Sequence, residues 1–172
     1  FRSHSDLLTA EKTCALASML DTGFACPSGD IDAAYRLAML YDEHTWGAYN
    51  SISEPFSELA RSQWTVKSGF AYEAREESRH LADQGLAALA SHIPAAGPHT
   101  LAVVNPLSHA RTDAVRTQLP PTLAALKGAF VLSDVRTGAR VPFQIARDGT
   151  LLFIAKDIPA FGYAVYRASP DS

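Results

Sequence analysis

Hydrophobic residues recur at helical spacing over the first half of the chain and at strand spacing over the second half. Before Pro94 they lie three or four positions apart, which is typical of amphipathic helices. After Gly97 they occur in short runs separated by turn sequences, which is typical of antiparallel strands. We therefore expect an α+β chain, with a three-helix bundle at residues 1–96 and an antiparallel β-sheet or partial β-sandwich at residues 97–172.

The first two helices are predicted from their apolar faces. The first covers about residues 5–20 and is ended by Gly23 and Pro27, and the second begins at an N-cap, Ser28 or Asp30. The apolar residues that recur at helical spacing are Leu8, Ala15, Leu16, Met19 and Leu20 in the first helix, and those on one face of the second are Ile31, Ala34, Tyr35, Ala38 and Tyr41.

The third helix is predicted to be much longer. Residues 53–55 (Ser-Glu-Pro) are typical of a helix start, and the apolar stripe continues to about His92. Such a helix is roughly 58 Å long at ~1.5 Å per residue, and the first two helices are less than half that length. Part of its apolar face must therefore pack on something else, although Trp64 and Phe70 are expected in the core. The stripe comprises Phe56, Leu59, Ala60, Trp64, Phe70, Ala71, Ala74, Leu81, Ala88 and Leu89.

Six short strands are expected after Gly97. The sequences Arg-Thr-Gly at 136–138 and Arg-Asp-Gly at 147–149 indicate turns between some of them. Because about 75 residues make a thin sandwich, an exposed face or edge is expected here. The predicted strands are residues 100–104, 115–119, 130–134, 141–146, 151–155 and 161–166.

Charge and composition exclude two classes of partner. The formal net charge is -3 and no stripe of Lys and Arg is present, which argues against nucleic acid. No apolar run approaches the ~20 residues of a membrane span, so no membrane association is expected. The chain opens at Phe1 without an initiator Met or a signal-peptide pattern, and we expect it to be a piece of a longer polypeptide.

The two cysteines form neither a disulfide framework nor a metal-binding pattern. Cys14 lies among apolar helical residues and is expected to be a small buried hydrophobe, whereas Cys26 precedes Pro27 in a loop. A bridge between the two stays open as an alternative. Thiols in the reduced form favour a cytoplasmic location.

Residues 41–48 concentrate the groups that can carry chemistry. Two carboxylates, an imidazole, a hydroxyl and an indole lie together at the end of the second predicted helix, which stops at Gly47. A charged imidazole at His44 would be stabilised by the helix C-terminus, by a few tenths to ~1 kcal/mol. A neutral imidazole there is also a good zinc ligand. The residues alone leave both interpretations open.

Several motifs in the chain resemble family-38 glycoside hydrolases, the α-mannosidases. The sequences at 42–48 (DEHTWGA), 51–53 (SIS) and 63–67 (QWTVK) are similar to the middle helical domain of that family. The sequences at 103–108 (VVNPLS) and 111–113 (RTD) are similar to the opening strands of its C-terminal β-sandwich region. The likeness continues in the same order through residues 131–144, 152–153 and 159–163.

The resemblance implies part of a retaining, zinc-dependent α-mannosidase that hydrolyses α-mannosidic bonds. The family's Asp nucleophile and acid/base carboxylate belong to an N-terminal catalytic domain, so no catalytic residue is assigned to this chain. We expect the chain alone to be inactive. The implied partners are an α-mannoside or mannose-containing glycan and the missing N-terminal catalytic domain.

The resemblance also assigns roles to individual residues. By position, His44 corresponds to the one zinc ligand that the helical domain supplies. The family pattern is His-His-Asp, whereas this chain has Glu43-His44-Thr45, so the hydroxyl of Thr45 replaces an acid that contacts substrate. Thr45 and Trp46 are the implied substrate contacts. Asp42 or Glu43 is expected to orient the imidazole through its other ring nitrogen.

The alternative function is a non-catalytic carbohydrate-binding or structural module of a glycoside hydrolase. Trp46 and Tyr49 fit both functions, because an aromatic face can stack on a sugar or anchor an interface. Saturable binding of mannose oligomers that survives His44→Ala would favour the module.

Overall fold

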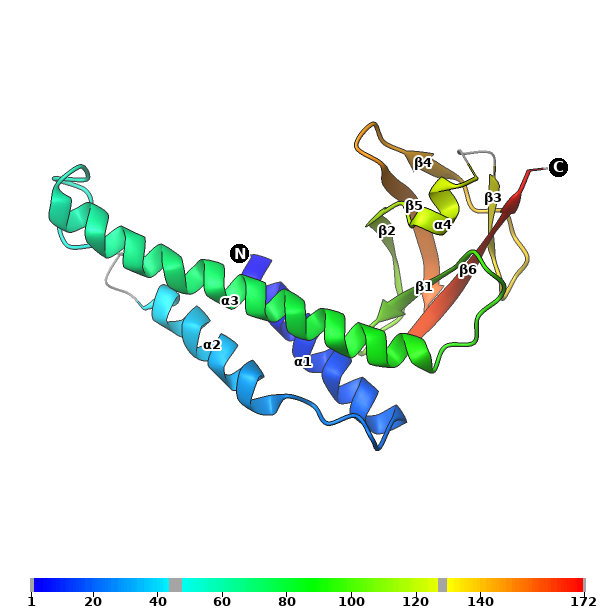
Figure 1. The fold of residues 1–172 in the computed structure, drawn as a ribbon, viewed down its shortest axis with the longest axis horizontal. Helices are drawn as coiled ribbons and strands as arrows, with labels where there is room; N and C mark the ends of the chain where they lie inside the picture. Colours follow the sequence, from blue (N-terminus) through cyan, green and yellow to red (C-terminus); the bar gives the residue numbers. More distant parts are fainter. Residues whose placement is uncertain (1, 44–47, 127–129, 172) are drawn as a thin grey trace. The chain divides into compact units, whose positions relative to one another are not determined.

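The computed structural model describes residues 2–43, 48–126 and 130–171, and the fold is α+β (Figure 1). The chain divides into two compact units, which we call the helical unit (Phe1–Leu89) and the β unit (Ala90–Ser172). None of the described helices is both long enough and apolar enough to cross a bilayer. The elements are α1 (Arg2–Leu20), α2 (Ser28–Asp42), α3 (Glu58–Ser91), β1 (Thr100–Asn105), β2 (Arg111–Gln118), α4 (Pro121–Ala124), β3 (Phe130–Asp134), β4 (Phe143–Ile145), β5 (Thr150–Ile158) and β6 (Gly162–Pro170).

The core of the helical unit is built mainly from small side chains. Helices α1 and α2 lie along α3, and all three contribute to one buried cluster (Figure 1). Alanine and cysteine side chains allow helix backbones to approach closely, so the cluster holds little apolar volume for its length. Its buried members are Leu7, Ala10, Cys14, Ile31, Ala34, Ala38, Ala74 and Leu81.

Helix α3 approaches α1 closely at Gly85. A Cβ atom at this position would lie 2.7 Å from Thr13 Oγ1 and 2.9 Å from the backbone nitrogen of Cys14. The Thr13 hydroxyl is itself buried and donates to the carbonyls of Thr9 at 2.8 Å and Ala10 at 3.1 Å. The contact therefore requires glycine on α3 and is made without an unsatisfied polar group.

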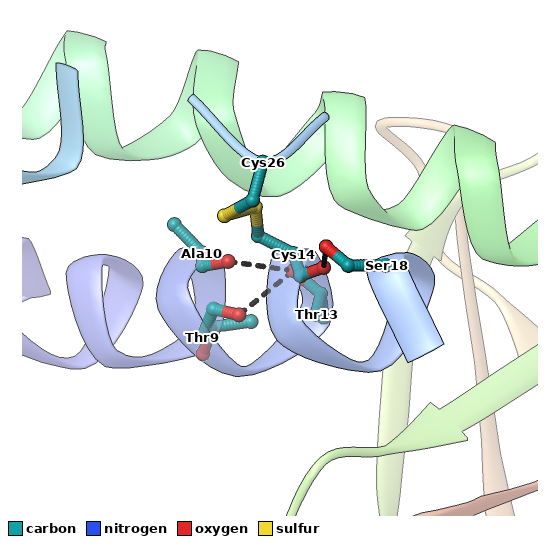
Figure 2. Close-up of a disulfide and its surroundings, with 6 residues drawn as sticks. All are labelled: Thr9, Ala10, Thr13, Cys14, Ser18 and Cys26. Atoms are coloured by element: carbon teal, nitrogen blue, oxygen red, sulfur yellow. Dashed lines mark hydrogen bonds between the residues drawn. A yellow bond between two sulfur atoms is a disulfide. The ribbon is translucent and has the colours of Figure 1, made fainter. Parts of the chain in front are cut away.

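A disulfide joins Cys14 of α1 to Cys26 in the loop that leads into α2 (Figure 2). The two Cα atoms lie 5.6 Å apart, and the bridge closes a loop with a sequence separation of 12. Cys14 is buried, as predicted. The expectation of reduced thiols is wrong, because the loop returns over α1 and brings Cys26 to Cys14, a tertiary arrangement that the local sequence does not encode.

The first helix is present as predicted, but three of the apolar residues that indicated it do not face the core. Leu8, Met19 and Leu20 are exposed, whereas the buried positions of α1 are occupied by Leu7, Ala10, Thr13, Cys14 and Ala17. Helix α3 approaches closely at Gly85, so the face of α1 with small residues lies inward. Small residues contribute little to a hydrophobic pattern, and the sequence therefore did not indicate this face. For α2 the prediction is confirmed, since Ile31, Ala34 and Ala38 are buried.

The third helix begins later than predicted. Residues 53–55 lie in turns, and the helix starts at Glu58 after Ser57, whose hydroxyl oxygen accepts from the backbone N–H of Ala60 at 3.2 Å. Ser57 thus acts as the N-cap of the helix, four residues after the predicted start at Ser53. Trp64 is 41% exposed and Phe70 is half-buried, so the prediction that Trp64 is a core residue is wrong. Phe56 and Leu59 are exposed as well.

The β unit contains two antiparallel three-stranded sheets within the described residues. Their strand orders are β1-β6-β3 and β2-β5-β4. Both sheets and α4 contribute large side chains to one core, where Phe153 and Tyr166 meet edge to face with ring centroids 5.0 Å apart. The buried members are Leu123, Phe130, Leu132, Leu151, Phe153, Ala155, Ile158, Tyr166 and Ala168.

The predicted strand at residues 141–146 is reduced to the three residues of β4. Arg140 still bridges to Ser133 of β3, but Pro142 has no N–H to donate, and the chain then pairs with β5 in the other sheet. The segment therefore passes from one sheet to the other at Pro142. The other five strands overlap their predicted ranges, and β3 matches its range at both ends.

Candidate functional site

The residues to which the sequence assigns chemistry lie between α2 and α3. His44, Thr45 and Trp46 are outside the described residues, so their predicted roles stay predictions. The structure does describe the residues on both sides of this segment, Glu43 before it and Ala48 after it. These flanking residues show how the rest of the helical unit holds the segment.

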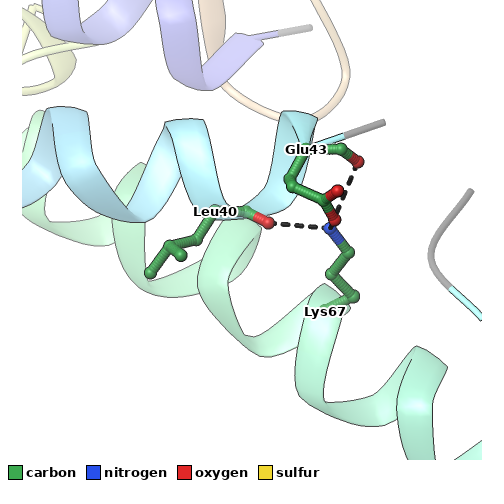
Figure 3. Close-up of polar contacts among 3 residues, drawn as sticks. All are labelled: Leu40, Glu43 and Lys67. Atoms are coloured by element: carbon green, nitrogen blue, oxygen red, sulfur yellow. Dashed lines mark hydrogen bonds and ion pairs between the residues drawn. The ribbon is translucent and has the colours of Figure 1, made fainter. Parts of the chain in front are cut away.

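Lys67 of α3 holds the end of α2. Its Nζ donates to the backbone oxygens of Leu40 at 2.9 Å and Glu43 at 3.3 Å, and it forms an ion pair with Glu43 Oε2 at 3.1 Å (Figure 3). The Lys67 side chain is 12% exposed. A cation at this position satisfies carbonyls that lack a helical partner and complements the negative end of the α2 dipole. The last described residue before His44 is therefore fixed to α3.

Gln63 holds the other side of the same segment. Its Oε1 accepts from the backbone N–H of Tyr49 at 2.8 Å, next to the buried residue Ala48. Gln63 precedes Lys67 by four residues, so the two side chains emerge from the same face of α3. We call this pair the α3 clasp. It attaches the chain to one helix face on both sides of residues 44–47.

The two carboxylates next to His44 have other partners. Asp42 Oδ2 lies 2.6 Å from Nε2 of His4, which ties the start of α1 to the end of α2, and Glu43 pairs with Lys67. Whether either carboxylate also orients the His44 imidazole stays a prediction. Among the residues described here, no group of three or more His, Cys, Asp or Glu side chains is placed to hold a metal ion.

Large apolar side chains are exposed around the segment. Tyr49 is 70% exposed, Ile52 is 90% exposed and Phe56 is 79% exposed. We call these three residues the apolar tip. Exposed apolar residues grouped in this way are typical of a surface that another protein part covers.

Sequence reasoning missed the α3 clasp, although a signal for it was present. Gln63 and Lys67 are the first and last residues of the QWTVK sequence, one of the motifs that resemble the α-mannosidases. Their spacing of four places them one helical turn apart. What the sequence did not show is that their partners are the residues on either side of 44–47.

Comparison with known proteins gives a match in structure. No family model and no curated protein sequence matches the chain. The crystal structure of an α-mannosidase from Enterococcus faecalis V583 aligns with 94% of this chain at a TM-score of 0.55 and 16% sequence identity. The chain spans 22% of the length of that protein. The likeness establishes a shared fold over most of this chain.

Proposed function

We propose that this chain is part of a family-38 glycoside hydrolase, a retaining, zinc-dependent α-mannosidase. Residues 1–96 would form its middle helical domain, and residues 97–172 the first strands of its C-terminal β-sandwich domain. The observation that supports the proposal best is the α-mannosidase fold over 94% of the chain. The nucleophile and the acid/base would lie in an N-terminal catalytic domain, and this chain contributes neither.

His44 is proposed to contribute one imidazole to a zinc site that the catalytic domain completes. Zinc in such a site would hold and polarise hydroxyl groups of the mannoside. A ligand on a chain segment must be held in place, because misplacement by about 1 Å can reduce a rate 100-fold. The α3 clasp meets this need, since Lys67 and Gln63 hold Glu43 and Tyr49 on either side of the ligand segment.

Thr45 and Trp46 are proposed to contact the substrate. The Thr45 hydroxyl can donate to and accept from sugar hydroxyls, although it lacks the charge of the acid that it replaces. The apolar tip is proposed to dock on the catalytic domain, which would bury Tyr49, Ile52 and Phe56. Both proposed contacts would put the end of α2 at the junction between the helical and catalytic domains.

The cytoplasmic location was expected because the two thiols were expected to be reduced, and the disulfide removes that reason. The Cys14–Cys26 bridge favours a compartment in which disulfides form and persist. We therefore propose an oxidising compartment for this protein in place of the cytoplasm.

The proposal is tested on the complete parent protein. Zinc content per chain and hydrolysis of an aryl α-mannoside would be measured for the parent, for His44→Ala and for His109→Ala. His109 is a matched control because it is an exposed imidazole in the β unit. We expect His44→Ala to lose most of its zinc and activity and His109→Ala to keep both. Equal zinc content in the two variants would refute the ligand assignment.

A second measurement uses the 172-residue chain by itself. It is expected to leave an aryl α-mannoside intact and to bind zinc only weakly, because one imidazole is too few ligands. Micromolar zinc binding that His44→Ala abolishes would contradict this expectation.

A further inference from the structure

The β unit contains a cleft that the proposed glycosidase function does not use, and charged side chains form part of its lining. The cleft has a volume of about 460 Å³ and lies between the β3–β4 connection, β5 and β6. Binding sites for small molecules usually measure ~300–1,000 Å³, so this cleft has room for one monosaccharide-sized ligand. Its polar lining includes Asp134, Arg136, Arg140, Lys156, Asp157 and Tyr166.

Three cationic side chains line the cleft. Arg136, Arg140 and Lys156 are exposed, and none of them forms an ion pair with another described residue. Guanidinium groups bind carboxylate and phosphate oxygens with two parallel hydrogen bonds. The cleft therefore offers free positive charge to an acid group.

Two carboxylates, those of Asp134 and Asp157, also line the cleft and supply negative charge. Asp134 is buried, and its Oδ1 accepts from the backbone N–H groups of Arg136 at 2.8 Å and Thr137 at 3.2 Å. This fixes the carboxylate and the start of the turn that carries both arginines. Asp157 is held by Thr112, whose hydroxyl oxygen accepts from the Asp157 N–H at 2.9 Å. Carboxylates placed in this way accept hydrogen bonds from the hydroxyl groups of a ligand.

Tyr166 is the observation that points to a ligand. It is 1% exposed, and its hydroxyl, which lies near the Lys156 backbone, makes no hydrogen bond of standard geometry with the described residues. Its backbone pairs with that of Asp134 across β6 and β3. Burial raises the pKa of Tyr166 and the charge of Asp134 raises it further, while the Lys156 backbone and the charge of Arg136 lower it by less, so the hydroxyl stays protonated as a donor. Buried polar groups in native proteins are nearly always satisfied, and a cleft ligand could supply the missing partner.

We propose that this cleft binds a hydroxylated anion of monosaccharide size, namely a sugar acid or a sugar phosphate. Arg136, Arg140 and Lys156 hold the acid group, while the two carboxylates accept from sugar hydroxyls. Tyr166 donates its hydroxyl to the ligand. The proposal depends on the β unit alone and does not require the glycosidase assignment.

The test is calorimetric titration of the 172-residue chain at low salt with glucuronate, glucose 6-phosphate, glucose and inorganic phosphate. We expect saturable binding of at least one of the two sugar anions and at least tenfold weaker binding of glucose. Binding of only one anion would identify whether the ligand class is the sugar acid or the sugar phosphate.

Variants locate the binding within the cleft. Arg136→Ala and Arg140→Ala are each expected to weaken binding at least tenfold, and Tyr166→Phe, which keeps the ring in the core, several-fold. Arg147→Ala is the matched control, because this exposed arginine lies in the β4–β5 turn. It should bind like the unmodified chain.

Three results would overturn the proposal. The first is the absence of saturable binding by both sugar anions. The second is binding that persists when Arg136 and Arg140 are both replaced by alanine. The third is inorganic phosphate binding as tightly as glucose 6-phosphate, since the carboxylates would then add nothing.

Discussion

The helical unit and the β unit are stabilised in different ways. The helical unit packs small side chains at close backbone distances and adds the Cys14–Cys26 disulfide, while several of its largest apolar residues are exposed. The β unit buries several of its large residues, with Phe130, Phe153 and Tyr166 all in one core. Burial of apolar area is the main source of folding stability. The β unit is stabilised mainly by burial of large side chains, and the helical unit mainly by close packing of its helices.

The two units also differ in the surfaces for which we propose functions. The helical unit leaves apolar side chains free at the end that carries His44, where a partner surface is proposed. The β unit buries one core of large side chains, and its cleft carries the charged side chains of Arg136, Arg140 and Lys156. Close helix packing in the helical unit should be destabilised by a single added atom. The core of large side chains in the β unit should be destabilised by removal of a side chain.

The largest effect is expected from Phe153→Ala in the β unit. Removing a buried aromatic ring that contacts Tyr166 should lower the free energy of unfolding by ~3–5 kcal/mol. Amide signals of the β unit in NMR-monitored urea unfolding would measure the loss. Tryptophan fluorescence gives the comparison, because Trp46 and Trp64 both belong to the helical unit. A change below 1 kcal/mol would contradict the description of this core.

Loss of the disulfide should come next. Replacing Cys14 and Cys26 together by alanine removes a cross-link whose typical contribution is ~2–4 kcal/mol. The tryptophan-monitored unfolding transition should move accordingly, and a reducing agent should shift the unmodified chain but not the variant. Two reactive thiols in the folded, untreated chain would show that the bridge does not form.

Two glycines on α3 should respond in opposite directions. Gly85→Ala forces a Cβ atom against Thr13 and should cost ~1–3 kcal/mol. Gly69→Ala meets nothing within 4 Å and should stabilise the helix by roughly 0.5–1 kcal/mol. Thermal unfolding of both variants checks the contrast, and equal effects would show that α1 and α3 do not approach as described.

The smallest effect is expected from Tyr35→Phe. The Tyr35 hydroxyl donates to Glu11 Oε2 at 2.7 Å, and loss of this bond between α2 and α1 should cost ~0.5–1.5 kcal/mol near neutral pH. Burial, together with the hydrogen bond to Glu11 and its charge, raises the pKa of Tyr35 from 10.0 to about 12. Between these values the folded state keeps a proton that the unfolded state releases, so the free energy of unfolding should fall as pH rises.

The phenylalanine variant should lack this contribution to the pH dependence. Urea unfolding from pH 9 to 12 would compare the two chains, with lysine and arginine titration common to both. Parallel curves for the two chains would contradict the raised pKa.

The β unit was easier to predict than the helical unit, and the reason is physical. Alternation in a strand depends on neighbouring residues, so β3 was predicted at both of its ends. Register, sheet order and the change of sheet at Pro142 depend on distant pairing and were not predicted. In α1, the inward face is selected by the approach of Gly85, which lies more than 70 positions away in the sequence.

The candidate site shows the same limit. The chemistry of His44, Thr45 and Trp46 is apparent from their side chains, whereas the clasp by Gln63 and Lys67 depends on how α2 and α3 pack. Ser53 and Ser57 are both acceptable caps, and only the folded chain shows that Ser57 is used. Groups that act locally could be predicted from the sequence, and groups that act through tertiary contacts could not.

The most direct test of the central claim is a crystal structure of the parent protein with zinc, using anomalous scattering to locate the metal. We predict a zinc peak ~2.0–2.1 Å from a ring nitrogen of His44, with the remaining ligands supplied by residues outside this chain. A fully ligated zinc ion that His44 does not contact, or a His44 side chain packed inside the helical unit, would contradict the account.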